Sequence, residues 1–482
     1  MNEERFDVVV VGSGAGGGVV AAELGARGRS VALLESGVHD SAHDFIRFEA
    51  RATRRLWWPT RFAHTGEGRP PLVMVGGRCV GGSTTINTKV ALRATDEDLA
   101  HWHRATGATL SMADLEPLYE RVERRLGVRE RADWPLSVRT VEPGFRALGA
   151  ELEPVRSYTD PSCTRCGCCY VGCPTNAGKS TLTSYIEPAL SRGELDLRAG
   201  CTVTRVRLDT RYGPLRATGV DYVDQAGERQ SLDASVVVVA GGTLNTPQIL
   251  MRSGLPDLGT ASASHLGRHL GTHTARIVHG LFDEPQDCHL VYPITARCDA
   301  FRRDADGGFV VEATTIMEPI GLASNLVDDD GLPLWGDRLS AVMRDYRHWV
   351  GLFAMANDSN TGTVEIRDDG TEMFTKPIPP EDQERLDGAH TFCREVLRAA
   401  GARKTVSTGL ITSHVQGTCR MGPDPERSVV DMRGQSHDVA GLFVADASLL
   451  PWTLSVNPSL TVMALALHVS QQVDSDPDGY LT

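Results

Sequence analysis

The chain has 482 residues, of which 41% are hydrophobic, 6% aromatic and 23% charged, the composition of an ordinary globular protein with a sizeable core. Lys and Arg number 49 against 62 Asp and Glu, so the formal net charge of −13 argues against nucleic acid as a partner. No run of 18 apolar residues and no leader pattern is present, so we expect no membrane span and a cytoplasmic protein. The length predicts two domains or one large discontinuous domain.

The first elements form a β-α-β pattern. Residues 7–11 (DVVVV) are typical of a buried parallel strand, and the glycine-rich run at 12–17 (GSGAGG) ends it. Residues 19–26 then predict a helix, and residues 31–35 (VALLE) predict a second strand that ends on an acid. The order of strand, glycine turn, helix, strand and acid predicts a dinucleotide-binding unit.

Each residue type in this turn has a physical role. Gly12 allows the tight turn, Gly14 lets the backbone approach a pyrophosphate, and Gly17 lets the helix pack closely on the strand. The phosphates would then meet the free N–H groups at the helix start. We expect Glu35 to accept hydrogen bonds from the adenosine ribose hydroxyls.

Later segments extend this pattern. Between about 270 and 405, apolar and polar residues alternate with frequent turns, as in an antiparallel sheet. Strands that suit the dinucleotide domain recur in the middle and near the end of the chain. The predicted elements are a surface helix at 114–127, hairpin strands at 203–208 and 219–222, buried strands at 235–240 and 442–444, and a helix at about 459–472.

Three stretches carry a family resemblance. They are GGRCVGGSTTIN at 76–87, GGTLNTPQIL with SG at 241–254, and HVQGTCRMG at 414–422, the last followed by DAS at 446–448 and NPSLT at 457–461. Together they resemble the glucose-methanol-choline (GMC) oxidoreductases, and the match extends from about residue 6 to 473. A CxxCGxCxxGC stretch like that of some bacterial members is also present.

The resemblance implies an α/β fold, with a split Rossmann-like FAD-binding domain at 1–270 and 406–482 and an antiparallel-sheet substrate-binding domain at 271–405. Members that hold flavin covalently through a histidine have it just before the asparagine of the first stretch. Ile86 occupies that position here, so we expect non-covalent FAD. The residues assigned to FAD by the turn and the resemblance are Gly12, Gly14, Ala15, Gly17, Glu35, Gly81, Gly82, Ser83, Asn87, Val203, Asp446, Ala447 and Pro458.

The implied chemistry needs a base. An alcohol that loses hydride to flavin must also lose its hydroxyl proton, and it is too weak an acid to ionise unaided near neutrality. His414 matches the family's active-site histidine, and Asn457 takes the opposite position, where it would orient the substrate oxygen. We expect His273 and His437 to be structural and His468 to be packed in the core.

The sequence says less about the substrate and the electron acceptor than about the cofactor. We expect oxidation of a small-molecule alcohol to an aldehyde or ketone, with a sugar-like or aminoglycoside-type alcohol as the substrate and a sterol or long-chain alcohol as the alternative. A lyase on the same fold, or a flavin-binding protein without turnover, is a hypothesis of another class. No motif identifies oxygen or another electron acceptor.

A cysteine-rich run, CTRCGCCYVGCP, occupies residues 163–174. Cys163, Cys166, Cys169 and Cys173 have the C-x2-C-x2-C-x3-C-P spacing of bacterial ferredoxins, which predicts an iron-sulfur cluster of the 4Fe–4S type and an electron exit from flavin. A zinc site with four thiolates and a compact loop without metal are the alternatives. Relatives with a similar stretch place the loop beside the flavin region, just before a helix near Thr181.

Overall fold

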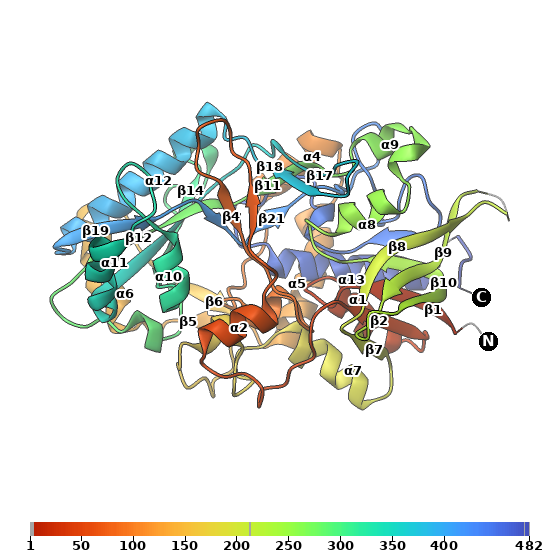
Figure 1. Ribbon diagram of the computed structural model, residues 1–482, viewed down its shortest axis with the longest axis horizontal. Coiled ribbons are helices and arrows are strands. Elements are labelled where there is room, and N and C mark those ends of the chain that lie inside the picture. The colour runs from red at the N-terminus through yellow and green to blue at the C-terminus, as the bar shows by residue number, and fades with distance from the viewer. Residues whose placement is uncertain (1–3, 212–213, 477, 482) are drawn as a thin grey trace.

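The computed structural model describes residues 4–211, 214–476 and 478–481. Its first sheet has seven strands in the order β7-β2-β1-β10-β9-β8, with β22 also paired to β10 (right side of Figure 1). Strand β1 (Arg5–Val11) lies parallel to β2 (Val31–Glu35) and to β10 (Arg229–Val239). The valines of β1 are almost fully buried, which explains why this run has no polar side chain at alternate positions. The remaining strands are β7 (Asp196–Ala199), the hairpin β8 (Thr202–Asp209) and β9 (Arg216–Val223), and β22 (Leu442–Val444).

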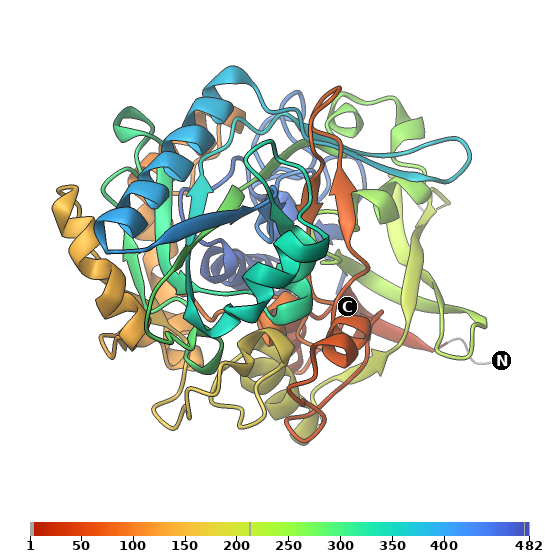
Figure 2. The same cartoon turned by 60° about the vertical axis from the view of Figure 1, so that its left-hand side comes forward.

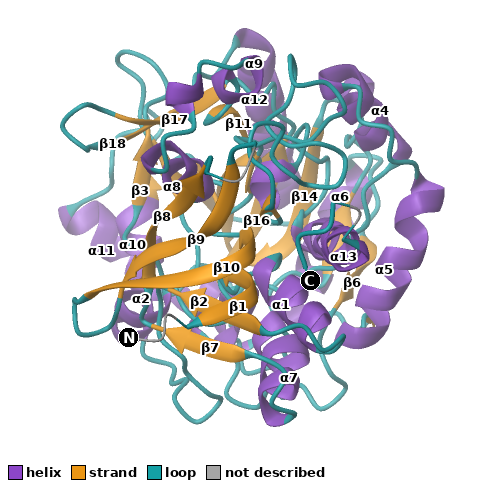
Figure 3. Cartoon of the chain, turned by 90° about the vertical axis from the view of Figure 1, so that its right-hand side faces the viewer, coloured by secondary structure: helices purple, strands orange, loops and turns teal. Residues whose placement is uncertain are grey.

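Helices cover one side of this sheet. Helix α1 (Gly17–Gly25) follows the glycine turn, and α13 (Ser459–Ser475) packs between α1 and α5 (Met112–Leu126), as Figure 3 shows. Residues 459–475 thus pack against the helix that follows the first strand. The β-α-β unit, the 203–222 hairpin and the final helix agree with the sequence predictions to within a few residues.

The second sheet is mostly antiparallel and has eleven strands. Its centre is formed by β12 (Thr274–Leu281), β16 (Trp349–Ala356), β14 (Phe309–Thr315) and β13 (Ala296–Cys298). The long helix α12 (Pro380–Ala399) lies across its outer face (Figure 2). Residues 271–405 do not build this sheet alone, since β3 (Arg61–Ala63), β4 (Leu72–Met74), β5 (Arg129–Arg131) and β6 (Glu153–Ser157) belong to it.

Smaller elements complete the fold. A four-stranded sheet has the order β18-β17-β11-β21. Its strands are β11 (Arg268–Thr272), β17 (Gly362–Ile366), β18 (Glu372–Thr375) and β21 (Val415–Gln416). The remaining helices of nine residues or more are α4 (Asp96–Thr106), α6 (Leu136–Ala147) and α11 (Gly336–Arg344); this statement covers the described residues only.

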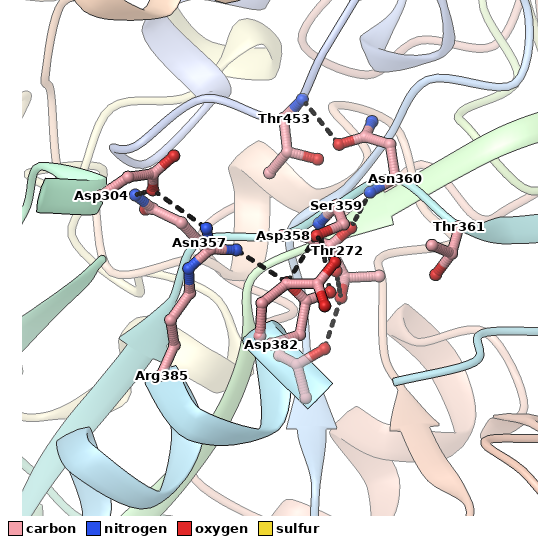
Figure 4. Close-up of polar contacts among 12 residues, drawn as sticks. Thr272, Asp304, Asn357, Asp358, Ser359, Asn360, Thr361, Asp382, Arg385 and Thr453 are labelled. Carbon is pink, nitrogen blue, oxygen red and sulfur yellow. Dashed lines mark hydrogen bonds and ion pairs between the residues drawn. The ribbon is translucent and has the colours of Figure 1, made fainter. Parts of the chain in front are cut away.

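A buried ion cluster ties the smaller sheet to the C-terminal segment. Lys376 Nζ lies 3.0 Å from Asp358 Oδ2 and 3.9 Å from Asp382 Oδ2. Next to Asp358, the Asn360 side chain accepts a hydrogen bond from Thr453 N at 3.3 Å (Figure 4). Because these charges are buried and mutually satisfied, the cluster fixes the position of the segment that follows Thr453.

In the part of the chain that the structure describes, no helix is both long enough and apolar enough to cross a bilayer.

Candidate active site

A cavity of about 1030 Å³ opens between the two large sheets. It is lined by the glycine turn after β1, by the segment at 82–88, and by strands β12, β14 and β16 of the second sheet. Eleven of the thirteen residues predicted to hold FAD line it, as do His414 and Asn457. These eleven are Gly12, Gly14, Ala15, Glu35, Gly82, Ser83, Asn87, Val203, Asp446, Ala447 and Pro458.

The other two, Gly17 and Gly81, lie behind the cavity wall. A Cβ on Gly17 would be 1.9 Å from the carbonyl oxygen of Gly12, so this glycine is required for the helix to pack on the turn. Gly81 has a φ of 89° and donates its N–H to Ser13 Oγ at 3.0 Å. Both residues therefore shape the cavity without contacting its contents.

The glycine turn fits a pyrophosphate. Gly12 has a φ of 90°, and a Cβ there would be 2.4 Å from Ala240 O, so only glycine fits. At Gly14 a Cβ would meet no atom within 4 Å, although the residue lines the cavity. The space beside Gly14 is therefore empty and lies just before the start of helix α1. A phosphate needs such a space to approach the backbone closely. On this observation the residues present fit FAD.

Glu35 and Asp446, both predicted to contact FAD, also accept hydrogen bonds from backbone N–H groups. Glu35 Oε2 accepts from Ser13 N at 3.0 Å and from Ser13 Oγ at 2.7 Å, and Oε1 accepts from Gly37 N at 2.8 Å. Asp446 Oδ2 accepts from Gly242 N at 2.8 Å and from Thr246 Oγ1 at 2.5 Å. Asp446 thus joins the turn after β10 to the turn after β22, a role that its motif did not indicate.

His414 forms a pair with His273. The two Nδ1 atoms lie 3.0 Å apart, and His273 Nε2 contacts the carbonyl oxygen of Leu454. A carbonyl can only accept, so Nε2 of His273 carries the proton and its Nδ1 is an acceptor. His414 Nδ1 must then donate, which leaves Nε2 of His414 with a free lone pair.

Electrostatics keep both rings neutral. Burial lowers the pKa of His273, and burial, with repulsion from His273 whenever that ring is protonated, lowers the pKa of His414 to about 3. Near neutral pH the His414 imidazole is therefore unprotonated, as a general base must be. His273 was expected to be structural; its contact with His414 comes from β11 and β12 meeting the 411–416 segment, which no local pattern indicates.

Asn457 lies on a tightly held segment. Leu454 N donates to Gln416 Oε1 at 3.1 Å, and Ser455 N donates to Asp98 Oδ1 at 2.7 Å. The Asn457 side chain is buried, and its Oδ1 has no hydrogen-bond partner among the described residues. An amide that faces a cavity with an unused acceptor is suited to hold a polar group of a ligand.

Sequence reasoning missed Glu312 on β14. It lines the cavity and is 1% exposed, and neither carboxylate oxygen has a hydrogen-bond partner among the described residues. Burial raises its pKa to about 7, although the neighbouring Asn457 amide and Arg297 oppose this shift. No motif surrounds this residue, so only its position facing the cavity reveals it.

The cysteine-rich loop borders the same cavity. Tyr170 and Val171, in its short 3-10 turn, line the cavity wall, and Trp57 Nε1 donates to Tyr170 O at 3.2 Å. The predicted position beside the flavin region is thus consistent with the structure. The short π-helical turn at Leu182–Ile186, which leads into a helix at Glu187–Ser191, follows the loop as expected.

The four cysteines with ferredoxin-like spacing, Cys163, Cys166, Cys169 and Cys173, lie around a second, small cavity. All eleven cysteines are within the described residues, and each is a free thiol. Among the described residues no group of three or more His, Cys, Asp or Glu is placed to hold a metal ion. The structure therefore gives the predicted iron-sulfur cluster no support. Lys89, which donates to Thr85 O at 3.2 Å, lies near Cys169 and Cys173, and burial lowers its pKa to about 8.

Comparisons with known proteins identify the family. Residues 6–275 and 357–466 match two family models, each described as GMC oxidoreductase. The chain is 29% identical to the 6'''-hydroxyparomomycin C oxidase of Streptomyces lividus, over 98% of this chain and 91% of that protein. It is 26% identical to a long-chain-alcohol oxidase of Arabidopsis thaliana, over 97% of this chain and 67% of that protein.

A solved structure shares the fold. The crystal structure of pyridoxine 4-oxidase from Mesorbium loti aligns with a TM-score of 0.75 at 20% identity, over 97% of this chain and 99% of that one. The two family models, which match more than half of the chain, establish that it belongs to the GMC oxidoreductase family and is an FAD-dependent oxidoreductase.

Proposed function

We propose that this protein oxidises an alcohol to an aldehyde or ketone, with His414 as the base. The observation that carries the proposal is the unprotonated Nε2 of His414 on the wall of the cavity that Asn457 also lines. His414 would take the hydroxyl proton at Nε2, while the Asn457 amide would hold the substrate oxygen. FAD, when bound, supplies the acceptor for the hydride.

The residues around the flavin support non-covalent binding. Ile86 lines the cavity and offers no nucleophile at the position where some relatives carry a histidine. We expect flavin to be released completely when the protein is denatured in acid. Flavin that stays with the precipitated chain would contradict this expectation.

For the substrate we favour a sugar-like or aminoglycoside-type alcohol, and the similarity to an oxidase named for hydroxyparomomycin supports this choice. A long-chain alcohol is the alternative, supported by the similarity to the Arabidopsis enzyme. Location in the cytoplasm stays a prediction from the sequence.

Bleaching of bound flavin without oxygen tests the reaction. A panel of sugar, amino-sugar and long-chain alcohols is mixed anaerobically with the holoenzyme, and the loss of oxidised flavin absorbance is followed. His414→Ala should abolish bleaching while FAD stays bound. His437→Gln is the matched control, because His437 contacts Ser428 Oγ at 3.0 Å and does not line the cavity. Bleaching that survives in His414→Ala would show that another group is the base.

The electron acceptor is a separate question. An iron-sulfur cluster at Cys163, Cys166, Cys169 and Cys173 would give reduced flavin an exit, and the ferredoxin-like spacing is its sole support. Iron, sulfide and zinc analysis of protein purified without oxygen tests it. Flavin bands without iron would leave the loop as a thiol cluster and would favour direct reoxidation by oxygen or a soluble acceptor.

A further inference from the structure

The alternation of strand β14 directs Glu312 into the cavity. Val311 and Ala313, its neighbours, are buried in the hydrophobic core beneath α12. Because successive side chains of a strand point to opposite faces, Glu312 lies on the other face, which forms the cavity wall. A carboxylate at this position is therefore presented to whatever the cavity holds.

The neighbours of Glu312 across the sheet do not satisfy it. Phe353 of β16 lies beside it in register, Ile277 of β12 lies beyond Phe353, and both line the cavity. On its other side in register is Arg297 of β13, but this guanidinium pairs with Asp299 at 2.8 Å. The carboxylate thus stands between an aromatic ring and a cation that is already engaged.

Other carboxylates on the wall have partners. Glu49 accepts from Ile320 N and Gly321 N at 2.7 Å, Glu318 lies 3.6 Å from Arg47, and Glu372 lies 3.5 Å from Arg61. Glu35 and Asp446 hold backbone N–H groups, as described above. Of the cavity-lining carboxylates that the structure describes, Glu312 alone has no partner within hydrogen-bond or ion-pair distance, although the Asn457 amide and Arg297 lie near enough to lower its pKa.

The charge of the cavity favours a cationic ligand. Apart from Glu35 and Asp446, which belong to the part assigned to FAD, its described wall carries four carboxyl groups, on Glu49, Glu312, Glu318 and Glu372, and two guanidinium groups, on Arg61 and Arg252. A buried carboxylate that has no ion pair and only one amide near it is costly, and a ligand that brings both positive charge and N–H groups lowers that cost. A primary ammonium has three donors, a hydroxyl has one, and a quaternary ammonium has none.

We propose that Glu312 binds a protonated primary amine of the substrate, so that the alcohol oxidised here is an amino alcohol. This inference rests on the proposed oxidation at His414 and narrows its substrate class. Because Glu312 neighbours Asn457, which would hold the reacting oxygen, the amine lies close to the alcohol carbon, as in 1,2- and 1,3-amino alcohols.

Matched substrates test the assignment. trans-2-Aminocyclohexanol, cyclohexane-1,2-diol and cyclohexanol differ at one carbon only, and the 1,3-series extends the set. The variants are Glu312→Gln and, as a control, Glu318→Gln, another wall carboxyl but one with a cation beside it. We expect wild-type holoenzyme to prefer the amine by about 10- to 100-fold in kcat/KM, the size expected of a charged hydrogen bond. Glu312→Gln should lose this preference and Glu318→Gln should keep it.

Two results would overturn the proposal while leaving alcohol oxidation intact. One is oxidation of cyclohexanol by the wild type with no preference for the amine. The other is an equal loss on all three substrates in Glu312→Gln, which would indicate a structural or proton-transfer role.

Binding gives a readout that does not need turnover. Cyclohexylamine and cyclohexyltrimethylammonium are titrated into the holoenzyme and followed by the flavin spectrum and by calorimetry. The primary amine should bind at least 10-fold more tightly than the quaternary one, and Glu312→Gln should remove the difference. Equal affinities in the wild type would overturn the assignment, even if no alcohol in the panel bleached the flavin.

Discussion

His273 and His414 meet edge to face, with their ring planes at 83° and their Nδ1 atoms 3.0 Å apart. The Leu454 carbonyl accepts from His273 Nε2 and so fixes the tautomer of His273. The Nδ1 of His273 can then only accept from His414 Nδ1, which fixes the tautomer of His414. With His414 as the proposed base, His273 would be a positioning residue, because it would act on the alcohol only through His414.

Replacing His273 should reveal this role. His273→Phe keeps an aromatic ring but removes the acceptor for His414 Nδ1, so we expect kcat to fall about 10- to 100-fold with little change in FAD binding. His273→Asn restores an acceptor and a donor of similar reach and should recover much of the loss. Steady-state kinetics separate kcat from KM, and equal losses in both variants would instead mean that the ring only fills space.

The glycine turn allows a prediction about cofactor affinity. Gly14→Ala adds a methyl group to open space, so the apoprotein should keep its melting temperature while FAD binds at least 10-fold more weakly. Gly12→Ala is the contrasting variant, because its Cβ would clash with Ala240 O and its φ is positive, so it should destabilise the fold. Fluorescence titration with FAD and thermal unfolding measure the two effects, and tight binding by Gly14→Ala would refute the phosphate assignment.

The buried ion cluster should be sensitive to the loss of one partner. Lys376 is fully buried beside Asp358, so Lys376→Met leaves an unpaired buried carboxylate. We expect the free energy of unfolding in urea to fall by about 3–5 kcal/mol. Lys404→Met, at an exposed site, is the control. Adding Asp358→Asn to Lys376→Met should recover part of the loss, and a loss under 1 kcal/mol in the single variant would contradict the account.

The burial of His279 predicts that the folded protein becomes less stable as the pH falls. It is fully buried, neither ring nitrogen has a partner among the described residues, and burial lowers its pKa to about 3. Because the unfolded chain takes up a proton near pH 6.5 and the folded chain does not, this residue costs stability as the pH falls below about 6.5.

The size of this effect can be measured. Between pH 7 and pH 5 the wild type should lose about 2 kcal/mol of unfolding free energy through His279 alone. His279→Met removes that contribution and should be more stable at pH 5 than the wild type, by denaturant unfolding at both pH values. A variant with the same pH dependence as the wild type would show that the ring is protonated or hydrated in the folded state.

Local patterns predicted the parts of the fold that local forces determine. The glycine turn, the valine run of β1 and the acid that ends β2 lie within one short segment, and the structure confirms them. His414 and Asn457 were identified through the family motif and line the cavity as expected. Their roles in catalysis stay predictions.

Features that depend on long-range contacts were not predicted. Strands β5 and β6 join the second sheet through pairing with β13, far along the chain, and nothing in their own residues indicates that partner. Glu312 stands out only because it faces the cavity, and His273 only because it contacts His414, and neither relationship can be read from the neighbouring sequence. The cysteine spacing likewise left three alternatives, because spacing alone does not fix how the thiols are arranged in space.

The segment around Asn457 has a consequence for how the protein is made. Strand β22 and helix α13 lie far along the chain from β1, yet β22 pairs with β10 next to β1, and α13 packs on α1. A nascent chain on the ribosome therefore lacks part of the flavin cradle until residues 442–475 have been made. Chains that stop before residue 442 would be unable to retain the cofactor, so the flavin absorbance of a preparation would report only chains that contain these elements.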